Sequence, residues 1–144
     1  MNEHNIKHLE FIQSIIARMN QNSFQMKGWA ITIISALLAI FAASFDKSGS
    51  GNVGFLFVAI APTFIFWVLD SYYLQQERKF RGIYNDVAKL TEEPNKIDIK
   101  EFEMPIQKYI GHKYNIFFVM WSKTEWPLYC LMIVGLIIAA LTLK

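Results

Sequence analysis

Cysteine is nearly absent from this chain, and the motifs of common catalytic sites are missing. Cys130 is the only cysteine among 144 residues, which excludes a fold held together by disulfides. No nucleophile elbow, P-loop, dinucleotide fingerprint, metalloprotease helix or paired-cysteine metal site occurs. We therefore expect a protein that is not an enzyme and that binds neither a metal nor a cofactor. Aromatic residues make up 15% of the chain, too many for a disordered protein.

Three long blocks of the chain contain no charged residue and no histidine. They are residues 28–45, 53–69 and 126–143, and they hold most of the apolar side chains. Each block reaches the lower part of the range of about 17–25 residues with which a helix crosses a bilayer. Because lipid cannot pair with backbone polar groups, such segments must be helical. The sequence therefore predicts an all-α membrane protein with three transmembrane helices. A soluble protein with buried helices is the alternative, which three charge-free runs disfavour.

The basic residues predict how these spans are oriented. Residues 1–27 and 70–125 contain all Lys and Arg residues except Lys47 and Lys144. Because Lys and Arg concentrate on the cytoplasmic side of membranes, we expect a cytoplasmic N-terminus, an outer loop at 46–52 and a C-terminus outside. The polar segment before the first block is longer than the n-region of a signal peptide, so the first span should be retained.

Aromatic residues and one carboxylate mark the cytoplasmic ends of the spans. Asp70 directly follows the second block. A carboxylate at this position either has a function or simply marks the boundary between the membrane and water. Lys27 and Arg78 are its candidate partners. The blocks contain no Asp, Glu or His, the residues that carry protons in proton-coupled transporters, which argues against that class of protein. Four tryptophans are expected in an aromatic belt at the same interface: Trp29, Trp67, Trp121 and Trp126.

Local features predict details of the spans. Pro62 should kink the second span and free the carbonyl one turn earlier, to which Thr63 could donate. Residues 122–125, Ser-Lys-Thr-Glu, are typical of a capping box, and Pro127 suits the first turn of the third span. Small residues favour helix packing in the first and third spans, either within one chain or between chains: Ala36, Ala43, Gly135 and Ala139.

The N-terminal segment is expected to form an amphipathic helix. Apolar residues recur at helical spacing from Ile6 to Met19, and the polar stretch 20–24 interrupts this stripe. The helix could pack on neighbouring helices or lie on lipid. Its nearly balanced charge favours packing.

The segment 70–125 is expected to hold further cytoplasmic helices. The second span should continue to Leu90, with Glu77 and Arg81 paired on the exposed side. Acids nearly balance the basic residues here, which excludes a nucleic-acid surface. A seam at seven-residue spacing predicts a coiled-coil contact or a packing face: Tyr73, Phe80 and Val87.

The rear of this segment is more irregular. We expect a linker at 95–104 and a helix that begins at Pro105. Residues 116–121 are apolar but too short to span. They form either an interfacial approach to the third span or a re-entrant element.

The three histidines do not form a metal motif. His4 and His8 lie four positions apart and would share one helix face, but a third ligand would have to be His112 or a carboxylate. Two solvated helix residues are the simpler interpretation.

Several motifs resemble a family of small bacterial inner-membrane proteins. They are residues 8–13 (HLEFIQ), 22–24 (NSF), 27–29 (KGW) and 66–81 (FWVLDSYYLQQERKFR). The layout of a helix, two spans and a long cytoplasmic helix also resembles the two-span effectors of bacterial antiviral systems. The second resemblance implies an oligomer that perturbs the inner membrane when it is triggered during phage infection.

These observations lead to three functional hypotheses. The first is a non-enzymatic homo-oligomeric inner-membrane protein, in its most specific form a pore-forming or membrane-disrupting antiphage effector. Its partners would be membrane lipid, further copies of itself and a cytosolic trigger protein, but not nucleic acid. The second is a membrane anchor or adaptor that recruits a cytosolic protein. The third is an interfacial lipid-modifying enzyme built on Asp70 and His112.

Overall fold

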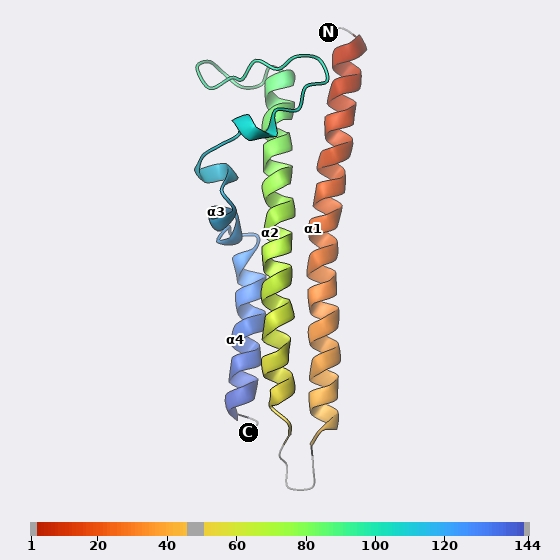
Figure 1. Ribbon diagram of the computed structural model, residues 1–144, viewed down its shortest axis with the longest axis vertical. Coiled ribbons are helices and arrows are strands. Elements are labelled where there is room, and N and C mark those ends of the chain that lie inside the picture. The colour runs from red at the N-terminus through yellow and green to blue at the C-terminus, as the bar shows by residue number, and fades with distance from the viewer. Residues whose placement is uncertain (1–2, 46–50, 143–144) are drawn as a thin grey trace. The chain divides into compact units, whose positions relative to one another are not determined.

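The computed structural model describes residues 3–45 and 51–142, and all its regular elements are helices (Figure 1). No strand occurs within those ranges, which confirms the predicted all-α class. The outer loop predicted at 46–52 lies mostly outside the described residues. In chain order the elements are α1 (Glu3–Ala43), α2 (Gly54–Val87), the short 3-10 helices η1 (Ile106–Lys108) and η2 (His112–Tyr114), α3 (Ile116–Met120) and α4 (Trp126–Thr142).

The chain divides into two compact units, and the two long helices contribute to both. The first unit consists of Met1–Ser23 and Ser71–Val119, and the second of Phe24–Asp70 and Met120–Lys144. Helix α1 continues without a break through the polar stretch 20–24, which interrupts only the apolar stripe. The expected N-terminal helix and first span are therefore parts of one helix.

The core of the first unit joins α1, α2 and the irregular segment that follows α2. Ile12 from α1, Phe80 and Ile83 from α2, and Tyr109 are buried together. Phe80 and Val87 of the expected seam contribute to this core, whereas Tyr73 is half-buried outside it. Part of the seam thus packs inside one chain.

Helix α2 ends three residues before the predicted position. The backbone N–H of Leu90 donates to the Asn85 carbonyl at 2.8 Å, and that of Lys89 donates to the Asp86 carbonyl at 3.1 Å. Lys89 has a φ of 59°, so these bonds form a Schellman motif with a left-handed residue just past the helix. The last carbonyls of α2 are satisfied in this way, and the helix stops at Val87.

The segment after α2 is largely irregular, as the predicted linker at 95–104 required. The single helix expected from Pro105 is replaced by η1 and η2. Gly111 lies between the two turns with a non-helical φ of 120°. The tyrosines on either side of it pack on α2, where a Cβ on Gly82 would lie 2.5 Å from the Tyr109 ring and 2.8 Å from the Tyr114 hydroxyl. The two tyrosine rings therefore sit directly against the helix backbone at Gly82.

The Glu77–Arg81 pair is confirmed, but it does not lie wholly on the exposed side. The Arg81 guanidinium contacts the Glu77 carboxylate, whose side chain is buried, while Arg81 itself is exposed. His8 is also buried, and its Nδ1 accepts a hydrogen bond from the Phe102 N–H at 3.4 Å. His8 is therefore not the solvated residue that the sequence indicated.

The second unit packs parts of α1 and α2 with α4. Its core contains Ile34, Phe41, Leu56 and Leu136, together with smaller residues. Thr63 is buried next to Pro62 and donates to the Ala59 carbonyl at 2.7 Å. The expected acceptor was the carbonyl of Val58, which loses its partner because Pro62 has no N–H. Thr63 instead bonds the carbonyl four residues before itself.

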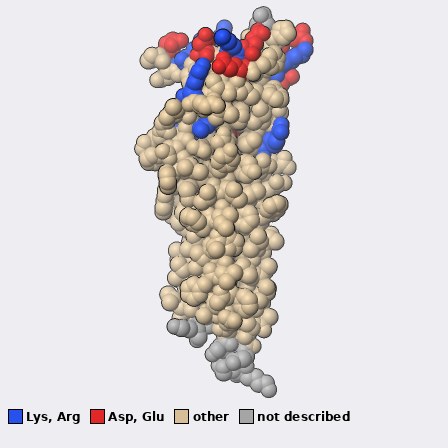
Figure 2. All heavy atoms as spheres, viewed as in Figure 1, with Lys and Arg blue, Asp and Glu red and all other residues tan. Residues whose placement is uncertain are grey.

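Most of the outside of the second unit is apolar, although Lys123 is exposed. The lower part of the face shown in Figure 2 carries no charged side chain among the described residues. Many large apolar residues on its helices are exposed, Phe57, Ile65, Leu131 and Leu141 among them. Helices α1 and α2 are long and apolar enough to cross a membrane, which indicates membrane association. Helix α4 is a shorter apolar helix of 17 residues. Helix length and hydropathy therefore support two of the three predicted spans.

Candidate functional site: a buried ion network

Asp70 is the starting point of a buried ion network in the second unit. Its side chain is fully buried, and the Lys27 ammonium lies 2.6 Å from Asp70 Oδ2. Lys27 belongs to α1 and Asp70 to α2, so this ion pair joins the two long helices. Lys27 is thus one of the two expected partners of Asp70. The other, Arg78, belongs to the first unit.

The same ammonium also binds Glu125, which directly precedes α4. Lys27 Nζ donates to Glu125 Oε1 at 2.9 Å and to Oε2 at 3.2 Å. The Glu125 side chain is 2% exposed and that of Lys27 is 23% exposed. One cation therefore links carboxylates from two different chain segments, and all three helices of the unit meet at this point.

Glu125 does not act in the capping box that the sequence indicated. Its carboxylate binds Lys27, and the Ser122 hydroxyl lies 3.1 Å from that of Thr124. The chain enters α4 through backbone turns, in which the N–H groups of Glu125 and Trp126 donate to the Ser122 carbonyl at 2.9 Å and 3.2 Å. Helix α4 begins at Trp126, after the residues of the expected capping box, so the role predicted for the glutamate was wrong.

Tyr129 completes the network from the first turn of α4. Its hydroxyl donates to Asp70 Oδ2 at 2.9 Å, and its ring is fully buried. The Trp67 ring stacks on the Tyr129 ring with centroids 5.9 Å apart and planes at 11°. Trp67 also donates from its indole N–H to the Met120 carbonyl at 3.3 Å. Aromatic rings therefore pack directly beside the charged groups.

Burial controls the proton on Glu125. It raises the pKa of the Glu125 carboxyl from 4.5 to about 7, helped by a hydrogen bond with Asp70 and opposed by the Lys27 ammonium. The network has two carboxyl groups and one cation, so a proton on Glu125 removes the excess negative charge. Glu125 therefore keeps its proton to a higher pH than an exposed glutamate does.

The network is suited to holding helices together rather than to binding a metal. Within residues 3–45 and 51–142, no group of three or more His, Cys, Asp or Glu side chains could hold a metal ion. Removal of one partner of a buried ion pair leaves an uncompensated charge, at a cost of about 3–5 kcal/mol. Lys27, Asp70 and Glu125 are thus expected to contribute strongly to the packing of α4 on α1 and α2.

Sequence reasoning missed two members of this network, Glu125 and Tyr129. One signal was present in the sequence. Lys27 directly precedes the first neutral block, Asp70 directly follows the second, and Glu125 directly precedes the third. The predicted orientation places these three positions at the same side of the membrane, where opposite charges would meet.

The other candidate residues occupy varied positions. Ala36, Ala43 and Gly135 are exposed, and Ala139 packs partly against the core of the second unit. Among the four tryptophans, Trp67 is buried, and the others have exposed rings: Trp29, Trp121 and Trp126. Asp70 and His112, the pair considered for an enzyme, belong to different units.

The chain was also compared with known proteins. No protein-family model, no curated protein and no solved structure matches this chain.

Proposed function

We propose that the protein is a non-enzymatic, homo-oligomeric protein of the bacterial inner membrane. Its three spans would be formed by the second half of α1, the first half of α2, and α4. The observation that carries this proposal is the Lys27–Asp70–Glu125 network, which ties α4 to two helices long enough to cross a membrane.

Helix α4 fits the role of a third span. With a rise of about 1.5 Å per residue, its 17 residues form a helix about 26 Å long. This length is close to the thickness of a bilayer core, which is about 30 Å. Its outer side chains are apolar and exposed, including Leu131, Val134 and Leu141. Only Glu125 and Tyr129, at its start, reach polar partners in the network. This arrangement suits a helix that faces lipid on one side and the two long helices on the other.

The positions of the charged residues support the orientation that we propose. Lys27, Asp70, Lys123 and Glu125 are the charged residues of the second unit within the described ranges, and all flank the neutral blocks at the ends assigned to the cytoplasm. The first unit contains most of the basic residues. We therefore place the N-terminus in the cytoplasm and the C-terminus in the periplasm.

Small exposed residues support assembly of several copies. Ala36 and Ala43 lie on nearly the same face of α1, and Gly135 lies on α4. All three are exposed in a single chain, so the core of that chain does not use them. Small residues let helices approach closely in lipid, where packing drives association. These positions are suited to contacts between copies.

A pore-forming or membrane-disrupting antiphage effector is the most specific form of this proposal. The two buried carboxylates of the network are both bound by Lys27, so the network leaves no free carboxylate to line a conduit inside one chain. A conduit would therefore form between copies. The first unit would receive the signal from a cytosolic trigger protein. The resemblance in layout to two-span antiviral effectors supports this form.

The second candidate function is a membrane adaptor for a cytosolic partner. The observation that favours it is a hollow of about 610 Å³ in the first unit, beside the exposed side chains of Ile110 and Phe117. An adaptor would copurify with its partner at a fixed ratio, whereas an effector would assemble alone.

The mass of the protein in lipid nanodiscs tests the proposal. We expect several copies per particle for the wild type and a single copy for Ala36→Leu combined with Ala43→Leu. The matched control is Ala42→Leu, because Ala42 is also exposed but lies about 120° around the helix from Ala36. A wild type that is monomeric, or a control that dissociates as readily as the double variant, would contradict homo-oligomerisation through this face.

A further inference from the structure

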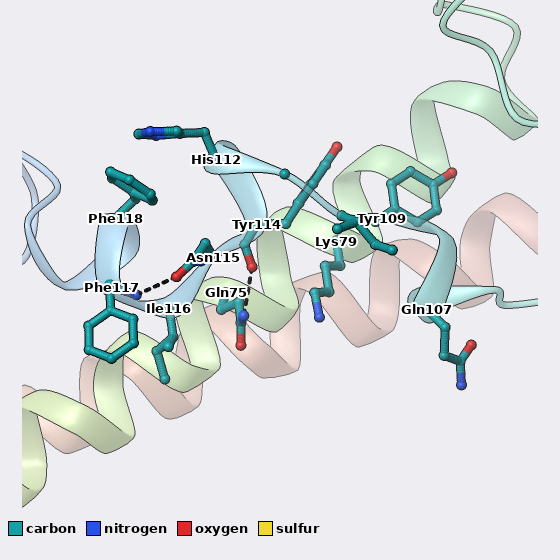
Figure 3. A pocket seen from close by; sticks show the side chains of 12 residues that line it. Gln75, Lys79, Gln107, Tyr109, His112, Tyr114, Asn115, Ile116, Phe117 and Phe118 are labelled. Carbon is teal, nitrogen blue, oxygen red and sulfur yellow. Dashed lines mark hydrogen bonds between the residues drawn. The ribbon is translucent and has the colours of Figure 1, made fainter.

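The first unit contains an open hollow whose lining is polar on one side and apolar on the other (Figure 3). Its volume of about 610 Å³ lies within the range of about 300–1,000 Å³ typical of small-molecule sites. Helix α2 supplies Gln75 and Lys79, and η1 supplies Gln107. Helix α3 supplies three apolar residues on the other side: Ile116, Phe117 and Phe118.

The wall of the hollow is held in place on α2. Gln75 donates from its side chain to the Tyr114 carbonyl at 2.6 Å, and Tyr109 donates from its hydroxyl to Asp86. The side chain of Asn115 accepts from the Phe117 N–H at 3.0 Å, which fixes the start of α3. The site is therefore formed by side chains with defined partners.

The charge of the hollow is positive. Among its lining residues Lys79 is the only Lys or Arg, and none is Asp or Glu. Within the described parts of the chain, Lys79 forms no ion pair or hydrogen bond, although it is half-buried. A half-buried ammonium without a counter-ion favours an anionic ligand. The amide of Gln107 lies on the same side of the hollow (Figure 3).

The apolar side of the hollow is uncovered. Phe117 is 69% exposed and Ile110 is 84% exposed, which is high for large apolar side chains next to a cavity. Helix α3 ends at Met120, and α4 begins at Trp126. Only residues 121–125 lie between the two helices, so at most about 20 Å of chain separates the end of α3 from the point at which α4 would enter the bilayer.

We propose that this hollow binds an anionic phospholipid, with the phosphate at Lys79 and the upper acyl chains against Phe117 and Phe118. A free phosphate would match Lys79 but would leave the apolar side uncovered. A neutral phospholipid would cover the apolar side but would lack the excess negative charge. The inference rests on the proposed membrane location and is independent of the proposed oligomer.

Native mass spectrometry of the full chain in an uncharged detergent tests this site. The protein is titrated with dioleoyl phosphatidylglycerol, dioleoyl phosphatidylcholine or inorganic phosphate. We expect the wild type to bind phosphatidylglycerol about tenfold more tightly than phosphatidylcholine, because only the former offers a net negative charge to Lys79. Inorganic phosphate should not displace phosphatidylglycerol at equal concentration.

Variants then assign binding to the hollow. Lys79→Gln should weaken phosphatidylglycerol binding about tenfold, and Lys79→Arg should retain it. Phe117→Ala should weaken the binding of both lipids by a similar factor, because it removes apolar contact with the acyl chains. The matched control is Lys100→Gln, which removes an exposed basic residue outside the hollow and should bind as the wild type does.

The contradicting results are equally specific. Equal binding of phosphatidylglycerol by Lys79→Gln and Lys100→Gln would overturn the inference, as would equal binding of the two lipids by the wild type. Displacement of the lipid by inorganic phosphate would assign the site to a free anion instead. The same spectra report the number of subunits. If the protein is a monomer and binds phosphatidylglycerol through Lys79, the result supports this inference and contradicts the proposed homo-oligomer.

Discussion

Lys27 binds both carboxylate oxygens of Glu125, at 2.9 Å and 3.2 Å, although the two residues are 98 positions apart in the chain. The same ammonium contacts Asp70 at 2.6 Å. The cation therefore bridges two buried acids that approach it from different elements.

Removal of the cation should destabilise the second unit strongly. Lys27→Met leaves Asp70 and Glu125 buried without a counter-ion, and we expect a loss of about 3–5 kcal/mol in the free energy of unfolding. Denaturant titration in detergent micelles, followed by the helical signal, measures this loss. Lys123→Met is the matched control, because Lys123 is an exposed lysine of the same unit. Equal losses for the two variants would show that the bridge contributes nothing specific.

The pH dependence of stability should carry the signature of Glu125. Because burial raises its pKa in the folded state from 4.5 to about 7, the folded protein retains a proton that the unfolded chain releases over that range. The stabilisation from this group is fully present below pH 4.5 and is lost as the pH rises through 7. Glutamine does not titrate, so the variant does not lose this stabilisation. We therefore expect the difference between the Tm of Glu125→Gln and the Tm of the wild type to rise from pH 4.5 to pH 8. A constant difference would contradict the raised pKa.

The hydroxyl of Tyr129 should contribute more to the stability of the fold than the hydroxyl of an exposed tyrosine. Tyr129→Phe removes the hydrogen bond to Asp70 and should cost about 1–3 kcal/mol, because a buried carboxylate loses a donor. Tyr72→Phe is the control, since the Tyr72 ring is 48% exposed. The free energy of unfolding is measured for both variants under the same conditions. Identical values would rule out a structural role for the Tyr129 hydroxyl.

The first unit should be sensitive to a methyl group at Gly82. Gly82→Ala places a Cβ 2.5 Å from the Tyr109 ring, and we expect overpacking to cost about 1–3 kcal/mol and to displace the wall of the lipid hollow. Gly28→Ala offers a contrasting control, because its Cβ would meet nothing within 4 Å. That change should stabilise the helix by about 0.5–1 kcal/mol. Hydrogen exchange at residues 105–118 measures the effect, and unchanged protection in Gly82→Ala would contradict the close packing.

The sequence predicted the helical class and the placement of the apolar helices, because charge-free runs mark them directly. It also predicted the irregular segment 95–104 and one partner of Asp70. It could not show that Glu125 turns away from a local cap, because a capping box and a distant ion pair use the same residue type. Nor did it indicate η1 and η2, since Pro105 favours any helix start and the contact of Tyr109 with Gly82 is a tertiary effect.

The most direct test of the ion network is an exchange of charges between Lys27 and Glu125. Lys27→Glu combined with Glu125→Lys keeps two carboxylates and one ammonium in the same place. The free energy of unfolding in detergent micelles is measured for the wild type, both single variants and the double variant. We predict that the double variant is more stable than the sum of the single effects by at least about 2 kcal/mol. Additivity of the two changes within about 0.5 kcal/mol would contradict the claim that this bridge holds the three helices together.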